Sequence, residues 1–239
     1  MRLALSLLLV LAGCTAAPAD PVALLGRWLD TIREQESVRF KVEIEVEGDD
    51  PRRRTFAGVM HVNRNGGAVA QQDVTAHVQQ RYGVTDYRAV SLDQDVYLQH
   101  DDLTLPPGKT FARLETQGMS WCWNYLTDLS LAEIDYHPGN VFRDLDRETI
   151  RLVAHDDNRF EFSAGGTPHS GSYVQGDVRL VVLVDDEDRV VRAERSGPSV
   201  DRQRERSVAE YSQWGTAADV LRPVDPSVAK AAEVVVHER

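Results

Sequence analysis

Two cysteines and seven histidines are the side chains of this 239-residue chain best suited to act as nucleophiles or metal ligands. Cys122 stands between Trp121 and Trp123, in a stretch where apolar residues recur every three or four positions. This pattern favours a small buried thiol over a catalytic nucleophile. The histidines are scattered, and none stands four residues from another or in a short cluster of ligands. The sequence therefore predicts no metal site and no cofactor.

Charged clusters are the next candidates for chemistry. Residues 185–188 are acidic, but they lack the glycine and the distal glutamate of an EF-hand loop and separate two apolar segments, so a charged hairpin turn is favoured over a calcium site. Arg202, Arg204 and Arg206 would share one face of a strand and could bind lipid phosphates, although a solvated outer face is favoured. A phosphate-binding glycine loop and a Gly-x-Ser-x-Gly motif are both absent. We therefore expect a binding protein rather than an enzyme.

The N-terminus carries a more specific signal. A ten-residue apolar run follows Arg2, which is about half the length of a membrane span and typical of a secretory signal. The run leads into Leu11-Ala12-Gly13-Cys14, which resembles the lipobox of bacterial lipoproteins. The resemblance implies a signal peptide at residues 1–13, lipidation of Cys14 with fatty acids such as palmitate, and a tether at residues 14–21. An ordinary signal peptide with a chance cysteine, or a buried amphipathic helix, is the alternative.

Composition limits the partners. The formal net charge is −11, so bulk electrostatics will not attract nucleic acid or an anionic membrane. Hydrophobic residues make up 42% and charged residues 27% of the chain, which is ordinary for a folded domain with a substantial core. Once Cys14 is acylated, Cys122 is the only thiol, so stability must come from packing rather than from a disulfide. We expect a monomer.

The spacing of apolar residues predicts the helices and strands that would position a site. A helix is predicted at residues 22–34, with Asp20 as its N-cap. Residues 38–47 alternate apolar and charged side chains, which predicts a strand with one buried face and one wet face. Similar patterns predict further antiparallel strands at residues 52–62, 69–79, 87–99 (a hairpin), 111–114, 149–154, 159–163, 178–184, 190–196 and 206–211.

The remaining segments interrupt or follow the strands. Residues 118–145 have a helical spacing of apolar side chains, with a second short helix starting near Pro138. Residues 227–239 form a C-terminal tail in which a frayed helix is expected. The single domain would therefore span residues 22–226.

This order predicts an α+β fold, in which a curved antiparallel half-barrel of about nine strands is covered by residues 118–145 as a helical lid. Such a half-barrel encloses an apolar cavity if the lid does not fill it, and the sequence leaves both possibilities open. The aromatic residues of the lid would either contact a ligand or pack in a filled hydrophobic core. The expected ligand-binding residues are Phe40, Val42, Ile44, Met60 and Val62, from strand alternation, and Trp121, Trp123, Leu126 and Phe142, from the insert.

Four stretches carry a resemblance to a known family. They are the lipobox, residues 96–98 followed by 105–111, residues 182–192, and residues 211–216 running into a tail rich in valine and proline. In order and spacing they resemble the LppX/LprG-type lipoproteins, which share the fold of the lipoprotein carrier LolA. Phe111 stands where this family would have tryptophan, and Asp188 replaces a turn glycine. The resemblance implies a half-barrel with a helical lid that holds an acyl-chain-bearing molecule.

Two functions are consistent with these observations. One is a lipoprotein anchored to the outer leaflet of the cytoplasmic membrane, on its extracytoplasmic face, that carries a lipid, glycolipid or other apolar molecule between sheet and lid. The other is an envelope scaffold or sensor with the same fold and a filled core, which acts through protein–protein contacts.

Overall fold

A computed structural model describes residues 20–62, 69–81, 83–92, 95–114, 136–142, 145–165, 168–169, 172–173, 176–198, 203–230 and 233–236. The first half of the chain forms α1 (Pro21–Glu34), β1 (Ser37–Glu47), β2 (Arg52–Val62), β3 (Val69–Gln80), β4 (Gly83–Leu92), β5 (Asp95–His100), β6 (Leu103–Thr104) and β7 (Phe111–Leu114). The second half forms the 3-10 helix η1 (Pro138–Phe142), β8 (Arg151–Asp156), β9 (Arg159–Gly165), β10 (Pro168–His169), β11 (Ser172–Tyr173), β12 (Asp177–Val184), β13 (Val190–Pro198), β14 (Arg204–Ser212), η2 (Asp225–Ser227), β15 (Val228–Ala229) and β16 (Val235–Val236).

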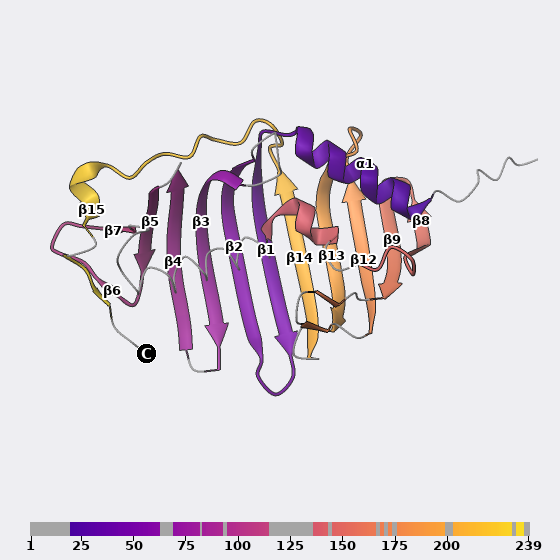
Figure 1. The fold of residues 1–239 in the computed structure, drawn as a ribbon, viewed down its shortest axis with the longest axis horizontal. Helices are drawn as coiled ribbons and strands as arrows, with labels where there is room; N and C mark the ends of the chain where they lie inside the picture. Colours follow the sequence, from indigo (N-terminus) through magenta and orange to yellow (C-terminus); the bar gives the residue numbers. More distant parts are fainter. Residues whose placement is uncertain are drawn as a thin grey trace, which may run out of the picture.

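One sheet dominates the described residues (Figure 1). Its 12 strands lie in the order β15-β7-β5-β4-β3-β2-β1-β14-β13-β12-β9-β8, and all neighbours are antiparallel except β15 and β7. The largely antiparallel sheet is therefore confirmed, with more strands than the nine expected. Strands β15 and β8 end the order without pairing to each other, so the sheet is open.

Strand β1 occupies the centre of the sheet. Val38, Phe40, Val42, Ile44 and Val46 are buried on one face, which we call the inner face, and the alternating charged residues lie on the outer face. On one side β1 pairs with β2, the next strand in the sequence. On the other side it pairs with β14, which lies more than 150 residues later. The predicted wet-and-buried alternation is confirmed, and it fixes which face of every neighbouring strand is apolar.

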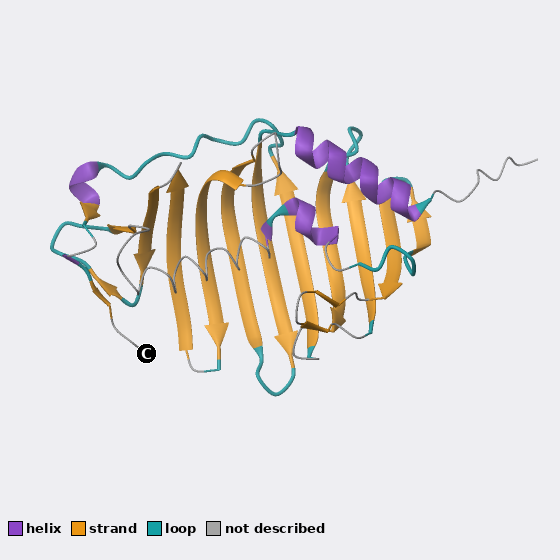
Figure 2. Cartoon of the chain, in the orientation of Figure 1, coloured by secondary structure: helices purple, strands orange, loops and turns teal. Residues whose placement is uncertain are grey.

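Helix α1 covers part of the inner face, in front of the right-hand strands of the sheet (Figure 2). The helix and its cap are confirmed, since the Asp20 carboxylate accepts a hydrogen bond from the backbone N–H of Val22 at 3.0 Å, and Pro21 occupies the first turn. Leu24, Leu25, Trp28 and Ile32 form its buried stripe. They join the hydrophobic cluster that contains the inner faces of β1, β2, β9 and β12.

The C-terminal segment corrects one expectation. The helix expected beyond residue 227 is wrong for residues 228–229 and 235–236, because Val228 and Ala229 pair in parallel with β7 and Val235 and Val236 pair with β6. Residues 213–229, here called the C-terminal strap, run along the upper edge of the sheet, past the ends of β2 to β5, to β15 (yellow in Figure 1). Ala217, Val220 and Val228 of the strap pack on Val59, Val90, Tyr97 and Phe111, an apolar patch on the outer face. Burial against distant strands, which local periodicity does not report, decides this conformation.

Gly58 on β2 gives a test of how closely the strands approach. A Cβ atom at this position would come within 2.1 Å of the Asp73 carbonyl oxygen on β3, and a backbone oxygen cannot move aside without disrupting the ladder. We expect Gly58→Ala to lower the free energy of unfolding by about 1–3 kcal/mol.

Gly26 on α1 is the matched control, because a Cβ atom there meets nothing within 4 Å. Gly26→Ala should raise the free energy of unfolding by about 0.5–1 kcal/mol, since alanine is the better helix former. Urea denaturation of both variants measures the two free energies of unfolding. An unchanged free energy of unfolding for Gly58→Ala would show that β2 and β3 are not so close.

Candidate functional site

The described ligand-binding candidates share one surface. Phe40, Val42 and Ile44 of β1, Met60 and Val62 of β2, and Phe142 of η1 belong to the same hydrophobic cluster on the inner face. Cys14, Trp121, Cys122, Trp123 and Leu126 lie outside the described residues. The structure therefore brings together every described candidate, and ligand contact by these residues stays a prediction.

An aromatic group seals the part of the inner face under α1. Trp28 is fully buried, with its ring centroid 5.0 Å from Phe160 and 5.9 Å from Phe162 of β9 in edge-to-face contacts. The Phe142 ring lies 6.0 Å from Trp28 on the other side, so the short helix predicted near Pro138, seen as η1, helps to close this end. Contacts of this kind are typical of a packed core and hold α1 against the sheet.

Tyr136 lies on the inner face near β1, β2 and β3. Its ring stacks on Phe40, with centroids 4.7 Å apart and planes 8° from parallel, and is tilted against Phe56. Its hydroxyl donates a hydrogen bond of 2.7 Å to Oε1 of Gln72. Tyr211 donates to the Tyr136 carbonyl at 3.4 Å, and burial raises the pKa of the Tyr211 phenol, so it stays neutral. Sequence analysis missed Tyr136 and Gln72.

One signal could have pointed to Gln72. On β3 it takes the same inward alternation as Val74, Ala76 and Val78, so it is a polar side chain at a position that the pattern reserves for apolar ones. Buried polar groups are hydrogen-bonded or functional, so such a break in the pattern is informative.

The inner face is less tightly sealed over β3, β4 and β5. Val78, Tyr87, Ser91 and Val96 are only partly buried, although Val74, Ala76, Ala89 and Leu98 on the same strands are buried. The inward residues of β1 and β12 are almost fully buried throughout. Tyr87 contacts both the main cluster and a second cluster at the far end of the face, where Leu98 and Leu114 pack with the β6–β16 pair. A continuous apolar face thus runs across the sheet, and its partly exposed positions lie on β3, β4 and β5, between the two clusters.

The outer face is charged instead. A recess of about 260 Å³ is lined by Lys41, Glu43, Glu45, Arg192, Arg206, Val208 and Glu210. Its cations are paired, with Lys41 Nζ 2.8 Å from Glu43 and Arg192 2.5 Å from Glu210. Arg204 and Arg206 lie on this outer face, as favoured from the sequence, and Arg202 is outside the described residues. The paired charges do not favour an anion-binding site.

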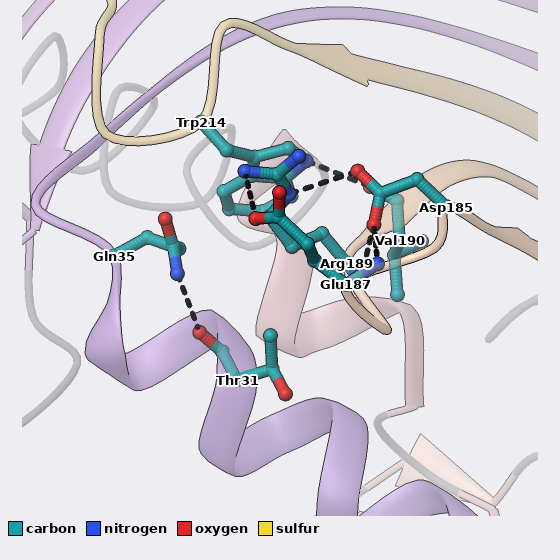
Figure 3. A network of polar contacts seen from close by, with 7 residues as sticks. All are labelled: Thr31, Gln35, Asp185, Glu187, Arg189, Val190 and Trp214. Atoms are coloured by element: carbon teal, nitrogen blue, oxygen red, sulfur yellow. Dashed lines mark hydrogen bonds and ion pairs between the residues drawn. The ribbon is translucent and has the colours of Figure 1, made fainter.

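The acidic stretch at residues 185–188 is the turn of the β12–β13 hairpin, as predicted (Figure 3). The Asp185 carboxylate accepts hydrogen bonds from the backbone N–H groups of Glu187 and Arg189 and a third from Arg189 Nε at 2.8 Å. Nearby, Trp214 Nε1 donates to the Val190 carbonyl at 3.1 Å. The Arg27 guanidinium of α1 donates to Asp188, so the turn also holds the helix.

Two further findings concern the described residues only. They contain no group of three or more His, Cys, Asp or Glu side chains that could hold a metal ion. None of their helices has the length and apolar character needed to cross a bilayer.

Some solved structures align with most of this chain. No family model and no curated protein matches the chain. Among solved structures, LprF from Mycobacterium bovis is 12% identical, with 84% of this chain and 95% of that chain covered and a TM-score of 0.47. A porin-like protein from Bacteroides uniformis is 9% identical, with 74% and 97% covered and a TM-score of 0.22.

The Asp185 network predicts a pH-dependent stability. Partial burial acts to raise the pKa of this carboxyl, but hydrogen bonds from Arg189 and Glu187 outweigh it and lower the pKa below its ordinary value. A lowered pKa in the folded state stabilises the fold above the unfolded-state pKa, and the contribution disappears as the pH falls through the folded-state pKa. Asp185→Asn should therefore cost about 1–2 kcal/mol at pH 7, and the difference from wild type should shrink in strong acid.

Asp186→Asn is the control, because Asp186 is the exposed neighbour in the same turn. It should leave stability within about 0.5 kcal/mol of wild type at pH 7. Denaturant titrations from pH 7 to pH 2 measure both variants. A cost of Asp185→Asn that is the same at every pH would contradict the role of the ionised carboxylate.

Proposed function

We propose that this protein is a membrane-anchored lipoprotein that binds a lipid, glycolipid or similar apolar molecule against the inner face of its sheet. The observation that carries the proposal is the apolar strip over β3, β4 and β5, which joins two buried clusters and is only partly buried at Val78, Tyr87 and Val96. Apolar surface that a protein keeps accessible in one continuous area is typical of a binding site. Burying acyl surface there would contribute roughly 25 cal/mol per Å².

The cover of this strip is part of the proposal. The chain leaves β7 at Leu114 and re-enters the described residues at Tyr136, and both side chains are buried on the inner face. The intervening sequence is rich in aromatic and aliphatic residues, so we propose that residues 118–145 form the lid of a half-barrel, with Trp121, Trp123 and Leu126 against the ligand. Phe40, Val42, Ile44, Met60, Val62 and Phe142 would form the opposite wall.

The anchor completes the proposal. Acylation of Cys14 would hold the domain on the extracytoplasmic face of the cell membrane, through a tether of residues 14–21 that ends at the N-cap of α1. The domain would then stay close to a bilayer, which is the source of acyl-chain ligands. No catalytic step is required, since uptake and release depend on transfer of apolar surface alone.

A second function is favoured by a different observation. Phe40, Val42 and Met60 are almost fully buried, as they would be in a filled core. In that case the protein would act as an envelope scaffold or sensor through protein–protein contacts.

Solvent extraction separates the two functions. The purified full chain is extracted with chloroform and methanol, and the extract is analysed by mass spectrometry. The carrier proposal expects one co-purifying lipid in a near-stoichiometric amount, whereas acyl groups on Cys14 are covalently bound and stay with the protein. A clean extract, together with no uptake of a fluorescent fatty acid, would support the filled core instead.

Overpacking gives a second test. Met60 is fully buried on β2 beside the accessible strip, so Met60→Trp should shrink a hollow site and reduce uptake of a fluorescent fatty acid at least severalfold. The matched control is Leu180→Trp, at an equally buried position on β12 in the same hydrophobic cluster. Each change should cost roughly 1–3 kcal/mol if it overpacks a filled region.

The carrier proposal expects Met60→Trp to reduce uptake with little loss of stability, and Leu180→Trp to lower the melting temperature with uptake retained in the folded fraction. If Met60→Trp sharply lowers the melting temperature and leaves uptake unchanged, the site is not at β2 and β3. Uptake and thermal unfolding are measured on the same preparations.

A further inference from the structure

A single row of side chains crosses the inner face from one strand to the next. The register places Val38, Met60, Gln72, Ser91, Val96 and Leu114 opposite one another on β1, β2, β3, β4, β5 and β7. The row is apolar at both sides and polar in the middle, where Gln72 and Ser91 are direct neighbours. Directly opposed side chains in a sheet have Cβ atoms about 5 Å apart, so these two polar groups can act on one ligand atom.

Gln72 is unusual for its surroundings. It is only 7% exposed, and its Oε1 already accepts the hydrogen bond from Tyr136. A glutamine amide has two N–H donors in addition to its oxygen, and no partner for Nε2 is found among the described residues. Nε2 is not one of the buried side-chain atoms that lack a partner in the described part of the chain, so it stays accessible and can donate to water or to a ligand that replaces the water.

The neighbouring contacts fix the direction of this amide. Tyr136 is held by its stack on Phe40, and its hydroxyl occupies Oε1 of Gln72. The N–H groups must therefore point to another part of the inner face. Ser91, half-buried on β4, adds a hydroxyl that can also donate.

The row also has a defined place along the strands. It lies near the end of the sheet where β3 begins and β4 ends, since Val69 and Leu92 are the terminal residues of those strands. From there the inner face continues along β3 through Val74, Ala76 and Val78, over about 20 Å at the rise of a strand. Val74 and Ala76 are buried, and Val78 is partly buried. A polar group at one end and a long apolar strip beyond it match a molecule with a carbonyl group and an acyl chain.

We propose that Gln72, with Ser91, binds the carbonyl oxygen of a fatty acyl ester or carboxylic acid whose chain lies along β3 and β4. This inference rests on the proposed function, because it names the polar contact within the same apolar site. Gln72 Nε2 and the Ser91 hydroxyl donate to the carbonyl oxygen, while Tyr136 positions the amide. A pure hydrocarbon would leave the amide unsatisfied, so the site selects acyl compounds.

Three fluorescent probes of equal chain length test the inference on the full-length, lipid-free protein. They are pyrenyldecanoic acid, its methyl ester, and decylpyrene, which lacks the carbonyl group. Wild type should bind the acid or the ester about fivefold to tenfold more tightly than decylpyrene, the range of one or two hydrogen bonds. The better of the two carbonyl probes identifies the natural class as free acid or ester.

The variant Gln72→Leu should lose this preference, with affinity for decylpyrene unchanged. Gln71→Leu is the matched control, because Gln71 is the preceding residue on β3 and faces the outer side; it should bind as wild type does. Gln72→Leu leaves the Tyr136 hydroxyl without its acceptor, so the double variant Gln72→Leu/Tyr136→Phe, which removes both partners, serves if the single variant is unstable. Ser91→Ala should reduce the preference about twofold to threefold.

The outcomes separate this inference from the function on which it rests. If wild type binds none of the three probes, the carrier proposal is overturned. If wild type binds all three and Gln72→Leu binds them with the same affinities, the carrier stands and the carbonyl site is wrong. A uniform loss of all three probes in a stably folded Gln72→Leu also overturns the carbonyl site, because it would mean that Gln72 acts through the shape of the site.

Discussion

The structure depends on one constraint: the apolar face of a very wide sheet must be removed from water. Helix α1 has 14 residues and is therefore about 21 Å long. Strands lie about 4.8 Å apart, so α1 can cover only about four or five of the 12 strands, even when it crosses them squarely. Trp28 of α1 packs on Phe160 and Phe162 of β9 and on Phe142, so the helix covers the part of the sheet near β9. Other segments must cover the rest, and the accessible strip over β3, β4 and β5 lies where α1 does not reach.

The outer face meets the opposite requirement, since it must stay compatible with water. Charged pairs such as Arg179 with Glu161 and Arg88 with Asp73 cross between neighbouring strands. Exposed pairs of this kind contribute little stability each, so their value lies in keeping this face polar and each strand in register. The apolar outer patch around Tyr97 is the exception, and the C-terminal strap covers it. Asp95 binds both Arg113 of β7 and Arg222 of the strap, which ties the cover to the sheet.

The elements predicted correctly are those whose signal is local. The alternation of residues 38–47, the Asp20 cap and the acidic hairpin turn each depend on neighbours within a few positions. The two-residue strand β15 could not be predicted in this way, because its partner β7 lies more than a hundred residues earlier and two residues have no period. The same holds for the site: Phe40, Val42 and Met60 follow from alternation, whereas the bond from Tyr136 to Gln72 joins residues 64 positions apart.

These contacts also limit how a ligand could reach the inner face. Removing α1 would expose Trp28 and break its three aromatic contacts, at a cost of about 3–5 kcal/mol by analogy with truncation of a buried aromatic side chain. It would also break the ion pair between Arg27 and Asp188, which is exposed and weak. Tyr136 contacts Phe40, Phe56 and Gln72, so it covers this part of β1, β2 and β3. Entry is cheapest where the inward side chains are already partly exposed, over β3, β4 and β5, and a ligand that enters there meets the Gln72 amide at the end of the strip.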